Sequence, residues 1–179
     1  MNAAPLPAAF YAQDAETVAR ALLGATLVFG EKRVRIVETE AYVGTHDLAC
    51  HAAKGRTART EVLFGPPGRA YLYLIYGMYE LFNVVTGADG DAQAVLVRAA
   101  EPLGGVTGKT DGPGKLTRAL GLSRAYNRHD LTRAPLTLEA GTPPAEVTTT
   151  TRVGIDYAGA WRDAPLRFYD AGSRWVSRR

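Results

Sequence analysis

A glutamate, a histidine and a dense run of tyrosines lie close together in the first half of the chain. Glu40 stands in the aliphatic segment 35–42, His51 follows it, and four tyrosines occur within residues 70–79. Aromatic rings stack on flat rings, and a carboxylate in an apolar setting can take a proton from water. The spacing therefore predicts an apolar slot that contains one charged group. A nucleobase flipped out of a duplex is a ring that such a slot would hold.

Glu40 is the sharpest catalytic candidate. Its neighbours Ile36 and Ala41 predict partial burial, which disfavours a charged carboxylate unless a cation or water supports it. Arg98, which ends the apolar segment 94–97, is the candidate cation. The alternatives are a glutamate at a strand end that points to solvent, and an arginine that pairs with some other acid in a structural salt bridge.

The tyrosines allow two interpretations. Tyr71 and Tyr73 fall on one face of a predicted strand, where cross-strand packing is the ordinary role. Tyr76 precedes Gly77, at which the strand is expected to bend and push the ring outward. A protruding ring on a hairpin is suited to act as a wedge between base pairs, and packing in the core is the alternative.

Two glycine-rich motifs suggest phosphate contacts. Residues 112–115 begin a predicted helix, where free amides and Lys115 suit a DNA phosphate; an ordinary junction of loop and helix is the alternative. Residues 104–110 resemble a phosphate-binding loop around Lys109, but the loop is one residue short of the pattern. A small nucleotide-hydrolysing domain built around Lys109 is the rival hypothesis.

We expect neither a metal ion nor another cofactor. His46, Cys50 and His51 lie near one another in the sequence, but only His129 is left as a further imidazole, and no Cys-x-x-Cys completes a tetrahedral site. The zinc deaminase signature is also missing, as is the Gly-x-Ser-x-Gly motif of acyl-transfer hydrolases.

Short strands and few helices must position these residues. Periodicity and turn signals predict helices at 15–23 and 115–120, and strands at 26–29, 33–42, 70–75, 83–86, 94–98, 136–138, 148–155 and 166–169. If 33–42 is extended throughout, one face carries Val34, Ile36, Glu38, Glu40 and Tyr42. This order predicts a mixed, mainly antiparallel α+β domain.

Composition is typical of a soluble globular protein. The 179 residues suit one domain, with 46% hydrophobic and 22% charged residues. We expect a short disordered leader over 1–9, which lacks the features of a secretory signal, and a single domain over 10–179. The single Cys50 fits a reducing, cytoplasmic compartment, and no apolar run reaches the length of a membrane span. The net charge of +3 permits a nucleic-acid partner without requiring one.

At these residues the chain resembles the alkyladenine (3-methyladenine, or methylpurine) DNA glycosylase family. The matching pieces run in order from about residue 10 to the end of the sequence and occupy 35–42, 48–51, 65–79, 83–85, 94–102, 112–121, 152–155, 161, 167–169 and 176–177. The resemblance implies a single-domain mixed structure with a curved antiparallel sheet and a protruding β-hairpin.

The resemblance also implies a role for each matched residue. Glu40 would deprotonate the water that attacks the sugar C1′, and Arg98 and the main-chain carbonyl of Val153 would hold this water. The base would be bound by Tyr42, His51, Tyr71, Tyr73 and Asn83. Of these, Asn83 would crowd the exocyclic amine of guanine. Tyr76 would enter the minor groove and occupy the space that the nucleotide vacated.

The activity so implied is that of a monofunctional DNA glycosylase in base excision repair. It would remove 3-methyladenine, 7-methylguanine or hypoxanthine from double-stranded DNA. No lysine lies at the matched pocket positions, so no Schiff-base lyase step is expected, and a wedge-and-pocket enzyme suits a monomer. Whether His51 or bulk acid protonates a neutral leaving base stays open. The alternative is a protein that recognises damaged bases without cleaving them.

The chain departs from the family pattern in two places. Glu80 stands where an apolar group is common, which affects the expected packing under the pocket. The loop 103–114 is short for the family, so we expect weaker contact with the flanking DNA.

Overall fold

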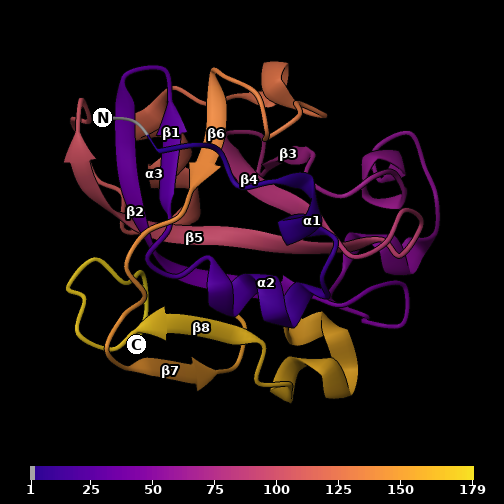
Figure 1. Cartoon of the computed structure of the whole chain (residues 1–179). Helices are drawn as coiled ribbons and strands as arrows, with labels where there is room; N and C mark the ends of the chain where they lie inside the picture. The colour runs from indigo at the N-terminus through magenta and orange to yellow at the C-terminus, as the bar shows by residue number, and fades with distance from the viewer. Residues whose placement is uncertain (1–2) are drawn as a thin grey trace.

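One curved antiparallel sheet is the framework of the molecule (Figure 1). The computed structural model describes residues 3–179. The strands are β1 (Thr26–Phe29), β2 (Lys32–Tyr42), β3 (Ala70–Ile75), β4 (Tyr79–Thr86), β5 (Gln93–Gly104), β6 (Leu136–Glu139), β7 (Val147–Thr150) and β8 (Arg167–Asp170). The helices are α1 (Ala8–Tyr11), α2 (Ala15–Ala21) and α3 (Pro113–Leu120), with 3-10 helices η1 (His51–Lys54), η2 (Glu61–Phe64), η3 (Arg124–Tyr126) and η4 (Asp156–Asp163).

Strand β2 is the centre of the sheet. The order is β3-β4-β5-β2-β1-β6, and β8 pairs with β2 and β7. One edge of β2 pairs with β5, while the other pairs first with β1 and then, over residues 38–40, with β8. In Figure 1, β7 and β8 lie side by side below α2. The sheet therefore forks along β2, and the fork brings β8 to the acidic half of this strand.

A shift in register separates the aliphatic half of β2 from the acidic half. The pairing with β5 is displaced on both sides of Glu38. Val34 and Ile36 consequently belong to the main hydrophobic core, as does Ala41, although an unbroken strand would put Ile36 and Ala41 on opposite faces. The expectation that Val34 and Ile36 share a face with Glu38, Glu40 and Tyr42 is therefore wrong.

The core lies between the sheet and two helices. α2 packs on β2 and β5, and α3 packs on β4 and β5. The Asp14 side chain caps α2 by accepting a hydrogen bond from the Thr17 N–H at 2.9 Å, as predicted for the start of this helix. The largest side chains of the core that are fully buried include Phe82 and Phe168. Dense packing on both helices makes the sheet a rigid support for the site.

Most predicted helices and strands are present, and their ends differ from the prediction where contacts with other segments extend or end a strand. The strands at 26–29 and 70–75 are confirmed with the same bounds. β4 begins four residues before the predicted 83, at Tyr79, because Tyr79 pairs with Ile75 across the hairpin. β7 ends at Thr150, and residues 151–155 leave the sheet instead of extending it to 155 as expected. The predicted α+β fold is confirmed. Within residues 3–179, no helix is sufficiently long and apolar to cross a membrane.

The segment expected as a loose leader is partly paired with the sheet. Residues 1–2 lie outside the described residues. Pro5 forms a β-bridge with Glu139, and the Leu6 N–H donates to the Leu138 carbonyl at 2.7 Å. Helix α1 then starts at Ala8. Pro5 and Leu6 therefore pair with the edge of β6, whose free main-chain groups explain the pairing.

A buried ion pair joins the loop after β2 to the loop after β7. Arg152 donates to Asp47 at 2.6 and 3.0 Å, and neither side chain is exposed. Asp47 also accepts hydrogen bonds from the N–H groups of Val43 and Ala49. Because both partners are buried, loss of one leaves a charge without compensation.

We expect Asp47→Ala to lower the free energy of unfolding by about 3–5 kcal/mol, since Arg152 is then buried and unpaired. Urea unfolding measures this loss. The exposed pair Arg162–Asp163, at 3.8 Å, supplies the control: Asp163→Ala should change stability by less than about 1 kcal/mol. A similar small loss for Asp47→Ala would contradict a stabilising role for the buried pair.

Candidate active site

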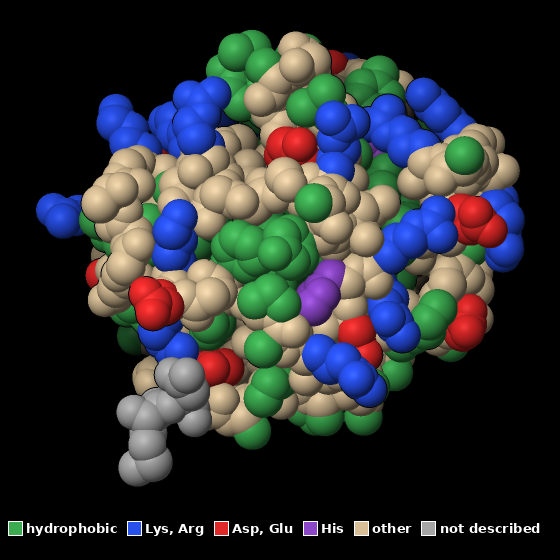
Figure 2. All heavy atoms as spheres, turned by 90° about the horizontal axis from the view of Figure 1, so that it is seen from above, with side chains coloured by type: hydrophobic (Ala, Val, Ile, Leu, Met, Phe, Trp, Pro, Cys, Tyr) green, Lys and Arg blue, Asp and Glu red, His purple; other side chains and the backbone are tan. Residues whose placement is uncertain are grey.

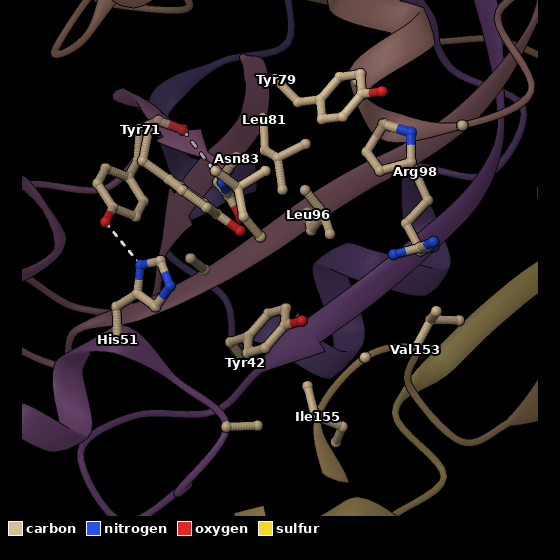
Figure 3. A pocket seen from close by; sticks show the side chains of 18 of the residues that line it. Tyr42, His51, Tyr71, Tyr79, Leu81, Asn83, Leu96, Arg98, Val153 and Ile155 are labelled. Carbon is tan, nitrogen blue, oxygen red and sulfur yellow. Dashed lines mark hydrogen bonds between the residues drawn. The ribbon is translucent and has the colours of Figure 1, made fainter. Parts of the chain in front are cut away.

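A cavity of about 670 Å³ opens between the sheet, η1, the start of α3 and the loop after β7 (Figure 3). This volume is in the range of small-molecule sites. In Figure 3, Tyr71 and His51 lie on one side of the cavity, Arg98 and Val153 on the other, and Tyr42 between them. The structure thus brings the sequence-predicted residues Tyr42, His51, Tyr71, Tyr73, Tyr76, Asn83, Arg98, Lys115 and Val153 to one cavity.

Glu40 lies behind the wall of this cavity and has no exposed surface. Its Oε1 accepts a hydrogen bond from the Tyr42 hydroxyl at 2.7 Å, and its Oε2 accepts one from the Val153 N–H at 2.7 Å. The Arg98 Nη1 lies 3.7 Å from Oε2. The two hydrogen-bond donors and the nearby cation all belong to residues that line the cavity. The carboxylate is thus held in a fixed orientation next to the space where a ligand would sit.

The Val153 contact differs in kind from the sequence-based expectation. The expectation concerned the main-chain carbonyl of Val153 as a holder of water, whereas the observed contact is made by its N–H. Nothing in the sequence distinguishes one main-chain group from the other. The role of the carbonyl stays a prediction.

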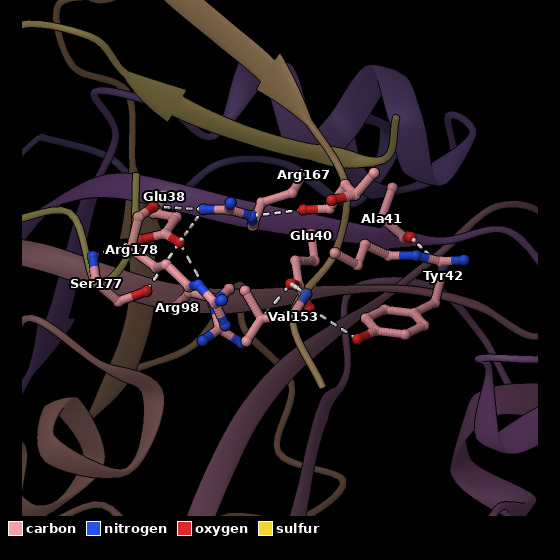
Figure 4. Close-up of polar contacts among 11 residues, drawn as sticks. Glu38, Glu40, Ala41, Tyr42, Arg98, Val153, Arg167, Ser177 and Arg178 are labelled. Atoms are coloured by element: carbon pink, nitrogen blue, oxygen red, sulfur yellow. Dashed lines mark hydrogen bonds and ion pairs between the residues drawn. The ribbon is translucent and has the colours of Figure 1, made fainter. Parts of the chain in front are cut away.

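Arg98 lies between two buried carboxylates, as Figure 4 shows. Its Nε is 3.4 Å from Glu38 Oε1, and its Nη1 is the group near Glu40. Both sequence alternatives are therefore present together, because Arg98 faces the catalytic candidate and also pairs with another acid.

Tyr42 is held as a neutral hydrogen-bond donor. Burial raises its pKa well above the usual value, and the charge of Glu40 adds to this effect. The Arg152 guanidinium lies 4.9 Å from the centre of the Tyr42 ring on the side of the buried ion pair with Asp47. Arg152 thus packs against the Tyr42 ring, which also lines the cavity.

An aromatic cluster forms the opposite wall. His51 Nδ1 and the Tyr71 hydroxyl are hydrogen-bonded at 2.8 Å, and the His51 and Tyr73 rings are 4.5 Å apart. Burial lowers the pKa of His51 to about 4, with Arg59 and Lys54 adding smaller effects of the same sign. The imidazole is therefore neutral at pH 7. Burial also raises the pKa of Tyr71 and Tyr73, so this wall carries no charge.

Asn83 is buried in β4 opposite Leu96 of β5, and both side chains line the cavity. The Asn83 Nδ2 donates to the Tyr71 carbonyl at 3.3 Å. This hydrogen bond limits the positions that the amide can take. Asn83 is therefore a rigid polar group in an otherwise apolar part of the wall.

Tyr76 projects from the tip of the β3–β4 hairpin. Its φ is 53°, that of Gly77 is 66°, and the Tyr76 side chain is 84% exposed. Two successive left-handed residues turn the chain tightly enough to leave the ring outside the core. Met78 on the same tip is also exposed. The geometry agrees with a protruding ring instead of the packed alternative.

Lys115 lies at the rim of the cavity, in the first turn of α3. It is exposed, and its Nζ is 3.4 Å from Asp111. Gly114 beside it packs so closely that an added Cβ would lie 2.7 Å from the Tyr79 ring. The motif thus brings α3 against the hairpin strand β4, which the sequence alone did not indicate.

Several residues of the site were not singled out by sequence reasoning. Tyr157 is exposed, lines the cavity and donates to the Ala49 carbonyl at 3.3 Å. Arg152 supports Tyr42, and Glu38 contacts Arg98. Arg152 lies in the matching piece 152–155, but its partner Asp47 is 105 residues away in the sequence, so the sequence did not indicate the contact.

The residues considered for a metal site and for a phosphate-binding loop do not have the arrangement that either site requires. Within residues 3–179, no group of three or more His, Cys, Asp and Glu side chains is arranged to hold a metal ion. His46 packs against Trp161 at 5.5 Å, whereas His51 faces Tyr71. Lys109 is exposed in the loop after β5, and the following helix starts only at Pro113. The phosphate-loop pattern would need a helix directly after Thr110.

The basic side chains form no continuous stripe on the face that Figure 2 shows. Lys and Arg side chains are spread around the rim of this face in small groups. Because the net charge is only +3, we expect a salt dependence of DNA binding that reflects few phosphate contacts.

Comparison with known proteins identifies the family of this chain. The sequence model of methylpurine-DNA glycosylase (MPG) matches residues 9–174. A protein of Myxococcus xanthus provisionally named a 3-methyladenine DNA glycosylase is 58% identical over 97% of this chain and 93% of its own length. Proteins with the same provisional name from Anaeromyxobacter dehalogenans and Legionella pneumophila are 55% and 46% identical, over 97% of this chain and 85% and 98% of their own lengths.

The match covers nearly the whole chain, including every residue of the cavity wall named above. The resemblance seen in the sequence is thereby confirmed. The chain belongs to the methylpurine-DNA glycosylase family.

Proposed function

We propose that this protein is a monofunctional DNA glycosylase that removes alkylated or deaminated purines from double-stranded DNA, with Glu40 as the general base. The observation that carries the proposal is the position of Glu40, which is buried directly behind a cavity of base-binding size and hydrogen-bonded to two residues of its wall. The family supports the class of enzyme, a hydrolase of N-glycosidic bonds in DNA.

The reaction follows from the chemistry of the substrate. Alkylation at N3 or N7 places a positive charge on the purine and makes it a good leaving group. Glu40 takes a proton from water, the water oxygen bonds to C1′, and the bond from C1′ to the purine nitrogen breaks with its electron pair on the purine. Arg98 and the Val153 carbonyl would hold the water, which adds acceleration by positioning.

The neutral walls favour a cationic base. Tyr42 and Tyr73 offer ring faces that attract a cation through their quadrupoles. His51 is neutral at pH 7, so it does not repel a positive purine. For hypoxanthine, which is neutral, His51 is a poor acid at this pH, so protonation of the leaving base falls to solvent. Asn83 would exclude guanine through its exocyclic amine.

Tyr76 is proposed as the wedge that fills the space left by the flipped nucleotide, and Lys115 as a contact to the DNA backbone. Lys115 is the lysine among the side chains that line the cavity, and it is exposed beside Asp111. The groups that contact Glu40 belong to Tyr42, Val153 and Arg98, and none of them is a lysine, which supports a reaction without a lyase step. A monomer that acts in the cytoplasm or nucleoid is sufficient for this role.

The proposal is tested by single-turnover release of 7-methylguanine or hypoxanthine from a duplex oligonucleotide, without metal. Glu40→Gln should slow release by about 10²–10⁴-fold because the general base is lost. Its affinity for an abasic analogue should stay within about tenfold of wild type. Wild type should leave an intact abasic site.

Glu16→Gln, an exposed change on α2, is the matched control and should release base at the wild-type rate. Tight lesion binding with no release by wild type would favour the alternative, recognition without cleavage. Magnesium-dependent ATP hydrolysis that is lost in Lys109→Ala would favour the nucleotide-hydrolysing alternative.

Tyr76→Ala should weaken binding to an abasic site in duplex DNA by about 5–150-fold, which corresponds to the loss of about 1–3 kcal/mol of stacking. Tyr76→Phe should retain most of the affinity, since the ring remains. Fluorescence anisotropy with a labelled duplex measures both. Val147→Ala, which trims an exposed apolar side chain on β7, should have no effect. Equal affinities of Tyr76→Ala and wild type would rule out the wedge.

The His51 ring should titrate near pH 4 by NMR. Its pKa in the folded protein is about 4, below the usual 6.5, so the unfolded chain binds more protons between these values. This contribution to stability is complete above pH 6.5 and is lost as the pH falls toward 4. The urea midpoint should therefore fall over this range in wild type and fall less in His51→Gln. Titration near pH 6.5 would contradict the neutral wall.

A further inference from the structure

The Arg98 guanidinium approaches Glu38 with Nε, the nitrogen attached to the side-chain carbons, more closely than it approaches Glu40 with Nη1. Its Nε is buried and, within residues 3–179, has no hydrogen bond of good geometry. The nearest charge to this atom is Glu38 Oε1 at 3.4 Å, while the outer Nη1 lies 3.7 Å from Glu40 Oε2. The place of Arg98 at Glu40 therefore depends on where Glu38 is held.

Glu38 is held by residues from the end of the chain (Figure 4). The Ser177 N–H donates to Oε2 at 2.7 Å, and the Ser177 hydroxyl donates to Oε1 at 2.9 Å. Arg167 in β8 donates to Oε1 at 3.0 Å. Glu38 has no exposed surface, so these donors compensate a charge that water does not reach.

Arg167 extends this contact to the loop that carries Val153. Its Nε donates to the Thr151 carbonyl at 2.7 Å, and its Nη1 donates to the Arg178 carbonyl at 2.6 Å. Both protein supports of the Glu40 Oε2 atom, Arg98 and the Val153 N–H, are thus linked to the same cluster. The segment 177–178 reaches the site although it is 139 residues from Glu38 in sequence.

Glu38 also balances the charge of Arg98. The Arg98 guanidinium lies between the two carboxylates of Glu38 and Glu40. Its Nη1 is 3.7 Å from Glu40 Oε2, which is longer than a hydrogen bond. Without Glu38, a bidentate contact with Glu40 is the strong alternative. Such a contact would occupy lone pairs of the carboxylate that has to receive the proton of the water.

We propose that Glu38, Arg167 and Ser177 form a brace that positions Arg98 at Glu40, so that docking of segment 177–178 completes the catalytic centre. Glu38 and Ser177 are positioning residues, since neither lines the cavity. The inference rests on the proposed function of Glu40 as the general base. It predicts that changes at the brace slow the chemical step more than they weaken DNA binding.

The test measures the single-turnover rate of 7-methylguanine release together with the affinity for an abasic duplex. Glu38→Gln should slow release by about 10–100-fold, in line with the loss of a supporting contact, with affinity within about threefold of wild type. Deletion of residues 177–179 should have a similar effect. Ser177→Ala, which keeps the N–H, should slow release by about 2–10-fold, and Ser177→Thr should restore the rate.

Glu139→Gln is the matched control, because Glu139 is a buried carboxylate paired with Arg33 at 2.6 Å on β6, outside the cavity wall. It should lower the urea midpoint without slowing release. Wild-type rates in Glu38→Gln and in the deletion, with wild type active, would overturn the brace and leave the proposed function intact.

A second readout does not depend on activity. The Arg98 Nε–H signal, assigned by its loss in Arg98→Lys, should shift in Glu38→Gln and in the deletion but not in Glu139→Gln. An unchanged signal in the first two variants would overturn the brace even if wild type released no base.

Discussion

Two carboxylates with no exposed surface, Glu38 and Glu40, stand on one strand, and the rest of the site depends on the compensation of their charge. A buried charge requires opposite charges and hydrogen-bond donors. The donors come from β5, β8, the loop after β7 and the segment that follows β8. These segments are distant in sequence, so the fold must be complete before Glu40 acquires its surroundings.

The same requirement divides the cavity into a charged end and a neutral end. Arg98 lies at one end, in front of the carboxylates, whereas burial keeps Tyr73 protonated and His51 uncharged at the other. Tyr42 lies between the two ends and is also kept protonated by burial. In the proposed reaction, a flat, positively charged purine would stack on aromatic rings, and its bond to the sugar would lie near the Glu40 carboxylate. Lys and Arg are nearly balanced by Asp and Glu, at a net charge of +3, so we expect long-range attraction to DNA to be modest and the proposed Tyr76 wedge to add to it.

Local signals in the sequence indicated two features of the candidate site. The tyrosine run, the turn at Gly77 and the apolar neighbours of Glu40 predicted a hairpin with a protruding ring and a buried carboxylate, and the structure has both. The register of β2 was not predictable in the same way. A bulge depends on how β5 and β8 pair along both edges, and those partners lie far along the chain.

Strand periodicity and turn residues are local properties, and they were sufficient to predict the mainly antiparallel sheet and the turn at Gly77. The family followed from the resemblance of the matched motifs. The contact of the Val153 N–H with Glu40, the support of Tyr42 by Asp47 and Arg152, and the contact of Ser177 with Glu38 could not be read from the sequence. Each of these contacts joins segments more than a hundred residues apart through a main-chain group or a buried ion pair. Such contacts exist because buried polar groups must find partners, and the identity of the partner is set by the folded arrangement and not by the neighbouring sequence.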